Sequence, residues 1–237
     1  TLHPAPVDHG IRFRRTDVKG SGRDIAARWE NVTDTTLCTT LSNADGVSVS
    51  TVEHLMAALA GCGVDNAVIE LDAAEVPVMD GSAAPFVFLI ECAGLVEQGA
   101  ARRMIEILKP VAIEDGDKRA RLRPAESFGV SCRIEFDNAV IGRQDCTFHL
   151  VNGAFKTDIC RARTFGFLHE VNQLHAAGLA RGGSLDNAVV IDGDAVMNAG
   201  GLRYGDEMVR HKVLDAIGDL YLAGHHIQGH LEVERGG

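Results

Sequence analysis

The residues best suited to metal chemistry lie near the C-terminal end of the chain. His211 and Asp215 are four positions apart, so on a helix an imidazole and a carboxylate can converge on one cation. Asp219 follows one turn later on the same side. Because His-x-x-x-Asp is a weak pattern by itself, a solvated polar helix face is the competing interpretation. Met208 and Leu222 share this side, which argues against a face that is fully exposed to solvent.

A second pair, Glu53-His54, could complete such a site. Adjacent helix residues point about 100° apart, so His54 can bind a cation while Glu53 faces a water molecule on it. Both residues also have structural interpretations. Glu53 lies three positions after Ser50, where the glutamate of a capping box belongs, and His54 fits a hydrogen-bonded core histidine. From the residues alone, these structural interpretations are at least as strong as the functional one.

Two groups of arginines are candidates for binding anions. In the run 161–167, Arg161 and Arg163 suit a phosphate or carboxylate, and the Thr164 hydroxyl can donate to a developing oxyanion. The structural alternative is a helix C-terminus with cations against its dipole, followed by a turn. Alternating arginines in 119–123 indicate first a solvated strand face and second an anion patch.

Apolar patterning predicts the elements that position these residues. Apolar side chains recur with helical spacing in 206–223, which places that helix against a core: Val209, Val213, Ala216, Ile217 and Leu220. A helix that begins after Ser50 should end near Gly61. Asp115-Gly116-Asp117 predicts a hairpin, and 227–233 a single final strand.

Strands and helices are mixed without strict βαβα alternation, which favours an α+β fold. The polar, glycine-containing stretch 97–101 is the predicted linker between a first domain, 1–98, and a second domain, 102–237.

Composition limits the partners and the compartment. The chain has 237 residues, 46% of them hydrophobic, and a formal net charge of −10, which argues against a nucleic-acid binder. The longest apolar run, 83–90, is far shorter than the ~20 residues of a membrane-spanning helix. Six scattered cysteines and no export signal favour reduced thiols in the cytoplasm. No pattern in the sequence indicates an oligomeric state, and we expect a monomer.

Taken together, these segments resemble the UDP-3-O-acyl-N-acetylglucosamine deacetylases, the zinc amidases of lipid A synthesis in Gram-negative bacteria. The similarity spans nearly the whole chain in consistent order, through the runs 51–59, 77–83, 161–167, 182–184 and 209–220. The resemblance implies two similar α+β domains, each a β-sheet layered with helices and carrying a small insert. It also implies an active site at the interface of the domains.

The resemblance assigns a role to each candidate residue. His54, His211 and Asp215 would hold Zn²⁺ and leave one position open for water. Glu53 would act as general base, and Thr164 would stabilise the oxyanion. Lys212 would neutralise charge near the substrate, and Asp219 would orient a catalytic histidine. Imidazole and carboxylate ligands also accept iron(II), so the metal used in the cell stays open.

The implied substrate is a UDP-linked glucosamine with a 3-O-hydroxyacyl chain, from which the N-acetyl group is removed. A βαβ insert at about 166–197 would form a passage for the acyl chain. Phe165 would stand at its entrance, and the other residues expected to contact the substrate are Leu168, Leu179, Gly183, Ser184 and Ala188.

Two departures from the family pattern keep alternatives open. The family's general acid is a histidine preceded by glycine, which would fall one place after Gly237, and His230 lies too early to replace it. The family's opening strand with its Gly-Leu-His segment is also missing before Thr1, so we expect a truncated sequence. The alternatives are a non-catalytic glycolipid-binding relative and a different zinc hydrolase, such as a peptidase, with the same ligands.

Overall fold

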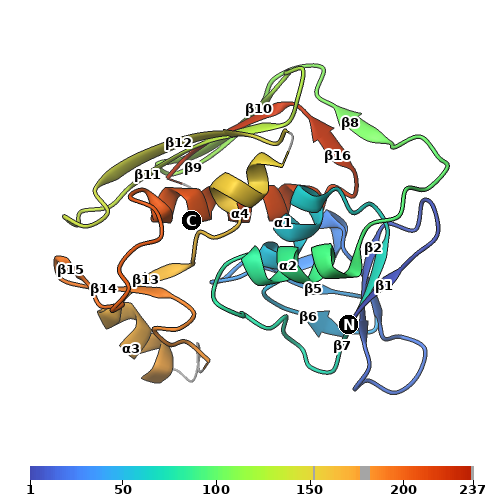
Figure 1. The fold of residues 1–237 in the computed structure, drawn as a ribbon, viewed down its shortest axis with the longest axis horizontal. Helices are drawn as coiled ribbons and strands as arrows, with labels where there is room; N and C mark the ends of the chain where they lie inside the picture. Colours follow the sequence, from blue (N-terminus) through green and yellow to red (C-terminus); the bar gives the residue numbers. More distant parts are fainter. Residues whose placement is uncertain (152, 177–181, 236–237) are drawn as a thin grey trace.

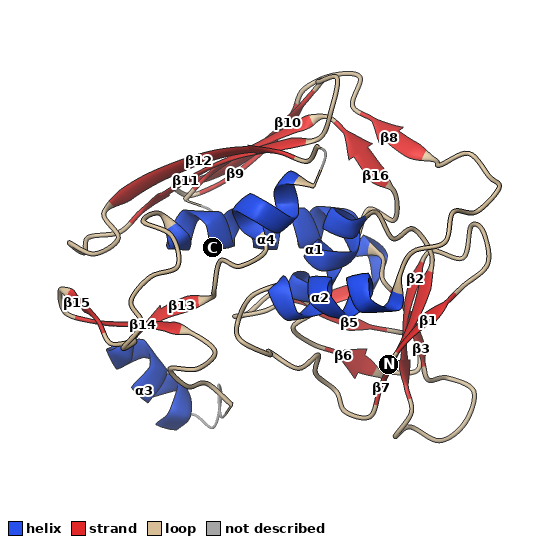
Figure 2. Cartoon of the chain, viewed as in Figure 1, coloured by secondary structure: helices blue, strands red, loops and turns tan. Residues whose placement is uncertain are grey.

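The α+β class expected from the sequence is confirmed. A computed structural model of the chain describes residues 1–151, 153–176 and 182–235. Two main sheets lie on the outside with helices between them (Figure 1 and Figure 2). The helices are α1 (Glu53–Cys62), α2 (Ala84–Ala93), α3 (Leu168–Ala176) and α4 (Glu207–Tyr221), with a 3₁₀ turn at Trp29–Asn31 and a π turn at Phe155–Ile159.

The first sheet has four strands in the order β1 (Leu2–Pro4), β7 (Ala67–Leu71), β2 (Ile11–Arg15) and β3 (Asp24–Ala26). Along β2, Ile11 and Phe13 are buried and Arg12 between them is exposed, which is the period of two expected for a sheet with one covered face. A smaller antiparallel sheet follows, made of β4 (Val32–Asp34), β5 (Thr40–Ser42) and β6 (Ser48–Val49).

The second sheet has five strands in the order β12 (Arg143–His149), β11 (Gly129–Glu135), β17 (His230–Glu234), β10 (Lys118–Arg123) and β9 (Val111–Asp115). The predicted hairpin is confirmed, since Asp115 pairs with Lys118. The predicted single final strand is wrong. β16 (His226–Gln228) pairs with β8 (Met104–Glu106), and after Gly229 the chain joins a different sheet as β17. The apolar run 227–233 therefore contributes strands to two different sheets.

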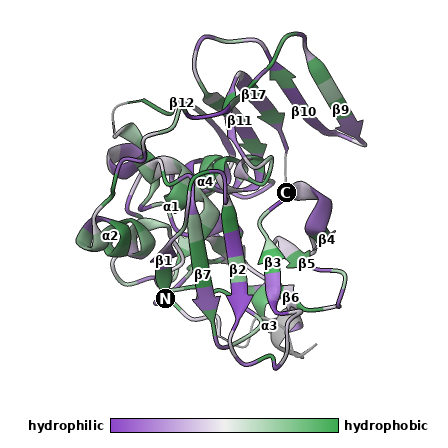
Figure 3. Ribbon diagram, turned by 90° about the vertical axis from the view of Figure 1, so that its right-hand side faces the viewer, coloured by the Kyte–Doolittle hydropathy of each residue, from purple (hydrophilic) through white to green (hydrophobic). Residues whose placement is uncertain are grey.

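The helices fill the space between the two main sheets. Val130, Cys132 and Ile134 alternate along β11 and are buried on the side where α4 packs. The predicted core stripe of α4 is confirmed for Val209, Val213 and Ile217, while Ala216 and Leu220 are partly buried. The hydropathy colours show the same pattern, with apolar segments at the centre and strands that alternate (Figure 3).

Helices α1 and α4 pack against each other at very short range. A side-chain carbon at Gly218 of α4 would collide with the backbone carbonyl of Glu53, so only glycine permits this approach. Eight of the ten residues of α1 are buried, which fits a helix that is apolar nearly all round. The close approach brings the start of α1 alongside the middle of α4.

A separate unit projects from the helices toward the lower left of Figure 1. β13 (Phe165–Phe167) pairs in parallel with β14 (Val189–Asp192), with α3 between them in the chain, so the three elements form a βαβ unit. The short strand β15 (Ala195–Val196) adds an antiparallel edge. The unit occupies the stretch where the insert is predicted. The domain division near residues 98–102 stays a prediction. Within the described residues, no helix is long and apolar enough to cross a membrane.

Candidate metal centre and active site

The turn before α1 determines where Glu53 and His54 point. Thr51 has a left-handed backbone with φ of 59°, which is rare for a β-branched residue, and its hydroxyl donates to Glu75. Helix α1 therefore begins at Glu53 with Val52 as its N-cap and no side-chain cap. The capping-box interpretation of Glu53 is wrong, because Ser50 lies before this turn, in a β-bridge with Glu75.

Three side chains from α1 and α4 meet between the helices. His54, His211 and Asp215, called here the metal cluster, each offer one ligand atom, and these atoms lie within 4.8 Å of one another. Asp215 Oδ1 is 3.3 Å from His211 Nε2 and 3.6 Å from His54 Nε2. His211 and His54 are only 2% and 4% exposed, so the solvated-face interpretation is wrong for His211, although Asp219 on the same face is exposed.

The metal cluster has the spacing and the unsatisfied atoms that a metal site requires. Donors about 2.0–2.2 Å from a tetrahedral zinc ion lie roughly 3.3–3.6 Å apart, as the two nitrogen–oxygen pairs do. Within the described residues, Asp215 Oδ1 is buried without a hydrogen-bond partner, as are His54 Nδ1 and His226 Nε2. A bare carboxylate oxygen between two imidazole nitrogens is costly unless a cation joins them. The residues present therefore fit a zinc ion.

The ionisation of the metal cluster also fits cation binding. Burial alone raises the pKa of Asp215, but the neighbouring His211, Lys212 and His54 outweigh it, so its pKa lies below the ordinary value. Burial lowers the pKa of His54 to about 4 and also lowers that of His211. At neutral pH the cluster consists of two neutral imidazoles and a carboxylate, the protonation states in which these groups bind metals.

Lys212 keeps the second oxygen of Asp215 occupied. Its Nζ donates to Asp215 Oδ2 at 3.2 Å, which leaves Oδ1 directed at the imidazoles. The same ammonium lies 5.8 Å from the centroid of the Phe165 ring. The charge of Asp215 raises the pKa of Lys212, so this side chain is a fixed positive charge beside the metal cluster.

Glu53 and Asp219 border the cluster and share one partner that sequence reasoning missed. The Thr39 backbone N–H donates to Glu53 Oε2 at 3.0 Å, and the Thr39 hydroxyl donates to Asp219 Oδ1 at 2.7 Å. Burial, with Asp215 adding to it, raises the pKa of Glu53 to about 7. Loss of surrounding water raises the pKa of Asp219 to about 6, although part of its surface is exposed. Thr39 lies far from both acids in the chain, so no local motif pointed to it.

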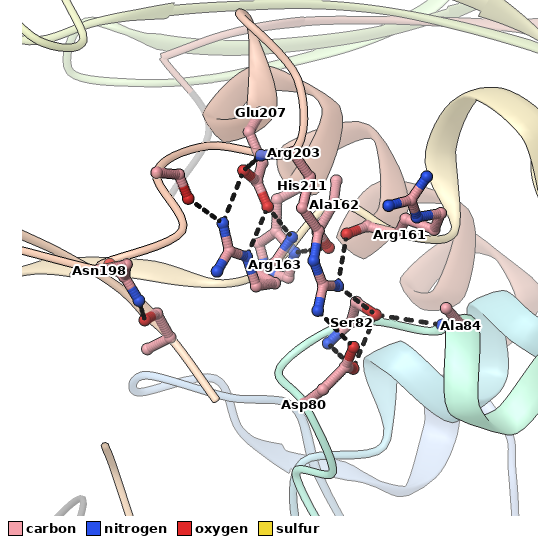
Figure 4. A network of polar contacts seen from close by, with 12 residues as sticks. Asp80, Ser82, Ala84, Arg161, Ala162, Arg163, Asn198, Arg203, Glu207 and His211 are labelled. Carbon is pink, nitrogen blue, oxygen red and sulfur yellow. Dashed lines mark hydrogen bonds and ion pairs between the residues drawn. The ribbon is translucent and has the colours of Figure 1, made fainter. Parts of the chain in front are cut away.

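The segment 161–165 runs past the metal cluster. His211 Nδ1 donates to the Ala162 carbonyl at 3.1 Å (Figure 4). The Thr164 N–H donates to Gly81 O at 2.8 Å, which ties the segment to the loop before α2. Phe165 opens β13 and contacts Phe136 edge to face. Thr164 and Phe165 thus lie between the metal cluster and the βαβ unit.

The arginine predictions have mixed outcomes. Arg163 is buried in an ion pair with Glu207, at 2.8 Å, so its side chain faces the interior and the anion interpretation is wrong for it. Arg161 is exposed. On β10, the alternating arginines pair with carboxylates, Arg119 with Glu114 and Arg123 with Glu232, which fits the solvated strand face.

The other predicted substrate contacts belong to the βαβ unit. Leu168 is the first residue of α3, and the Ser184 N–H donates to the Asn187 side chain. Gly183 is exposed, and the Ala188 carbonyl accepts from Asn198. Leu179 lies outside the described residues. Their roles in binding substrate stay predictions, as does the histidine expected after Gly237.

Comparisons with known proteins point to one family. A family model described as UDP-3-O-acyl N-acetylglycosamine deacetylase (LpxC) matches residues 1–237. UDP-3-O-acyl-N-acetylglucosamine deacetylase of Saccharophagus degradans is 55% identical over all of this chain and 78% of its own length. The protein of that name from Phenylobacterium zucineum is 56% identical over 98% of this chain and 79% of its own.

The α+β fold with a possible metal-binding group fits the class of metalloenzymes, and the comparisons identify the family within it. The chain belongs to the UDP-3-O-acyl-N-acetylglucosamine deacetylase family and is an enzyme, as the resemblance implied.

Proposed function

We propose that this chain is a zinc-dependent amidase of lipid A biosynthesis in the cytoplasm. Its substrate would be UDP-3-O-(hydroxyacyl)-N-acetylglucosamine, and its products acetate and the free amine. Family membership supports the substrate. The observation that carries the metal chemistry is Asp215 Oδ1, which is buried between the Nε2 atoms of His54 and His211 and has no hydrogen bond from any described residue.

His54, His211 and Asp215 would hold the zinc ion. When bound there, zinc would lower the pKa of a water molecule to about 7 and polarise the acetyl carbonyl. His211 is oriented by its hydrogen bond to Ala162, and Asp215 by its bond to Lys212. Such bonds fix the ligand atoms before the ion arrives.

Glu53 would take the proton from the attacking water. It is 8% exposed and fixed by the Thr39 N–H, and its pKa of about 7 suits a general base that works at neutral pH. Thr164 would donate its hydroxyl to the oxyanion, and the Lys212 ammonium would balance negative charge on the substrate. Asp219 would orient the catalytic histidine that the family resemblance places after Gly237.

The βαβ unit would bind the hydroxyacyl chain. Phe165 lies at the point where this unit leaves the metal cluster, within reach of Lys212. The other residues proposed to line the passage lie further along the same unit: Leu168, Gly183, Ser184 and Ala188. The two-domain division at 98–102 would put the metal cluster between domains, since α1 precedes that boundary and α4 follows it.

Metal analysis combined with an acetate-release assay tests this proposal. We expect about one zinc per chain, and release of acetate from the UDP-linked acyl sugar by the full natural chain. Zinc binding with cleavage of peptides but not of this sugar would favour a different hydrolase. Binding of the sugar without turnover would favour a non-catalytic relative, and absence of zinc would refute the metal assignment.

A further inference from the structure

Glu207 is a fully buried carboxylate, 0% exposed, one helical turn before His211 on α4. Its two oxygens accept four N–H donors (Figure 4). Oε1 accepts the backbone N–H of Arg163 at 3.0 Å and Arg163 Nε at 2.8 Å. Oε2 accepts Arg163 Nη2 at 3.1 Å and the backbone N–H of Arg203 at 2.6 Å. An ion pair alone would not need the two backbone donors.

One peptide group connects Glu207 to the metal cluster. The carbonyl of the Ala162–Arg163 peptide accepts the His211 Nδ1–H at 3.1 Å, and the N–H of the same peptide donates to Glu207 Oε1. Because an amide is conjugated, a negative charge at its N–H makes its carbonyl a stronger acceptor. A carbonyl only accepts, so His211 carries its proton on Nδ1. The lone pair of Nε2 then faces Asp215 Oδ1 at 3.3 Å.

We propose that Glu207 is a positioning residue for His211 and acts through the Ala162–Arg163 peptide. The proposal rests on the proposed metal site. Ligating histidines commonly donate their second N–H to a carboxylate or a carbonyl, which fixes the tautomer and raises the basicity of the ligand nitrogen. Here a carboxylate acts through a peptide, and α4 carries both ends of the arrangement, since Glu207 and His211 are four residues apart.

A second contact keeps this peptide in place relative to the loop before α2. Arg203, whose backbone N–H binds Glu207, forms an ion pair with Asp80 at 2.8 Å and donates to the Arg161 carbonyl at 2.9 Å. Segment 161–163 is therefore held at two points, by Glu207 at the Arg163 N–H and by Arg203 at the Arg161 carbonyl (Figure 4). The carbonyl that orients His211 has little freedom to move.

The test compares Glu207→Gln with wild type. Glutamine keeps the shape but removes the charge, so we expect the zinc dissociation constant, from chelator competition, to rise about 10–100-fold. The His211 Nδ1–H proton resonance of the metal-free protein should move upfield and exchange faster with water. Ile25→Ala is the matched control. Ile25 is 0% exposed on β3, in the first main sheet, and its truncation destabilises the fold to an extent comparable with the loss of a buried ion pair.

The control should lose stability but keep zinc affinity within about twofold and leave the His211 resonance in place. Unchanged zinc affinity in Glu207→Gln, or an equal loss in Ile25→Ala, would overturn the proposal. If Glu207→Gln does not fold, nitrogen NMR of the metal-free wild type tests the proposal by identifying the tautomer of His211. The Nδ1–H tautomer of His211 is expected, and the Nε2–H tautomer would overturn the proposal. Failure of wild type to bind zinc would instead refute the proposed function, while the tautomer still tests the role of Glu207.

Discussion

Helix α4 carries a fully buried acid, Glu207, and a partly buried acid, Asp215, whose hydrogen bonds differ. Glu207, with its partners Arg163 and Arg203, accepts four N–H donors and leaves neither oxygen bare. Asp215 lies two turns later, and one of its oxygens accepts a hydrogen bond from Lys212. In the part of the chain that the structure describes, its other oxygen has no hydrogen bond, although two imidazole nitrogens lie within 3.6 Å. Both groups have a lowered pKa, so ionisation does not distinguish them.

The two acids differ in whether the protein itself satisfies both carboxylate oxygens, and this difference distinguishes a structural acid from a candidate ligand. Leaving a buried polar group without a partner costs about 1–3 kcal/mol, and more for a charge. Glu207 avoids this cost within the protein, so it needs no ligand. Asp215 Oδ1 does not, and under the proposed function the two imidazoles beside it would be metal ligands. A cation bound at this oxygen, as we propose, would supply the missing partner of Asp215.

The strongest way to break this comparison is His211→Ala. Removing one of three ligands should abolish retention of zinc through dialysis against a chelator, a larger effect than the roughly 10–100-fold cost of losing an outer partner. Zinc content by elemental analysis provides the measurement. His149→Ala, which removes an exposed histidine of β12, is the control and should retain about one zinc. Equal zinc in both variants would contradict the ligand assignment.

Glu53→Gln should separate binding of the metal from catalysis. The amide cannot accept the proton from water, so kcat should fall by about 10²–10⁴-fold while zinc content stays as in wild type. Acetate release and elemental analysis measure the two quantities on one sample. A variant with near wild-type kcat would show that another group is the base.

Thr164→Val tests the assigned oxyanion donor with a side chain of the same shape. Loss of one preorganised donor commonly lowers kcat by about 10²–10³-fold, with zinc content and stability nearly unchanged. The backbone bonds of Thr164 to Gly81 and Val189 remain in this variant. A change in KM with unaltered kcat would assign Thr164 to substrate binding instead.

Acid should remove the stabilisation that Glu207 provides. Burial raises the pKa of Glu207, but its bonds to Arg163 and to the backbone N–H groups outweigh this, so the folded value lies below the ordinary 4.5. The stabilisation is complete above pH 4.5 and is lost as the pH falls through the folded value. We expect Glu207→Gln to unfold more easily by about 3–5 kcal/mol at pH 7, with the gap closing in acid. Urea unfolding at several pH values measures this gap, which would stay constant if Glu207 were neutral.

The smallest expected loss of stability comes from removing an exposed ion pair. Glu232 pairs with Arg123 on β10, and both side chains are more than a third exposed. Glu232→Gln should cost less than about 1 kcal/mol at any pH. A loss as large as that of Glu207→Gln would show that burial is not what distinguishes these ion pairs.

Much of this architecture could be predicted from the sequence. The period of apolar residues located α4, the Asp-Gly-Asp turn located the β9–β10 hairpin, and the spacing of His211 and Asp215 placed them on one helix face. These features are local, because each depends on residues within a few positions of one another. Spacing alone left the metal interpretation open, with Glu53 and His54 as one possible completion, and the family resemblance made His54 a predicted ligand.

Features that depend on distant residues were missed. Thr39 joins Glu53 and Asp219 across 14 and 180 positions, and Glu207 reaches Arg163 across 44. Ser50 has the right spacing for a capping box, but the left-handed Thr51 starts the helix after it. Such outcomes depend on tertiary packing, which local spacing does not encode.

X-ray absorption at the zinc edge of the wild-type protein tests the central claim most directly. The account predicts nitrogen and oxygen neighbours at about 2.0–2.2 Å, with outer-shell scattering from two imidazole rings. Sulfur neighbours at about 2.3 Å, supplied by cysteines, would contradict it.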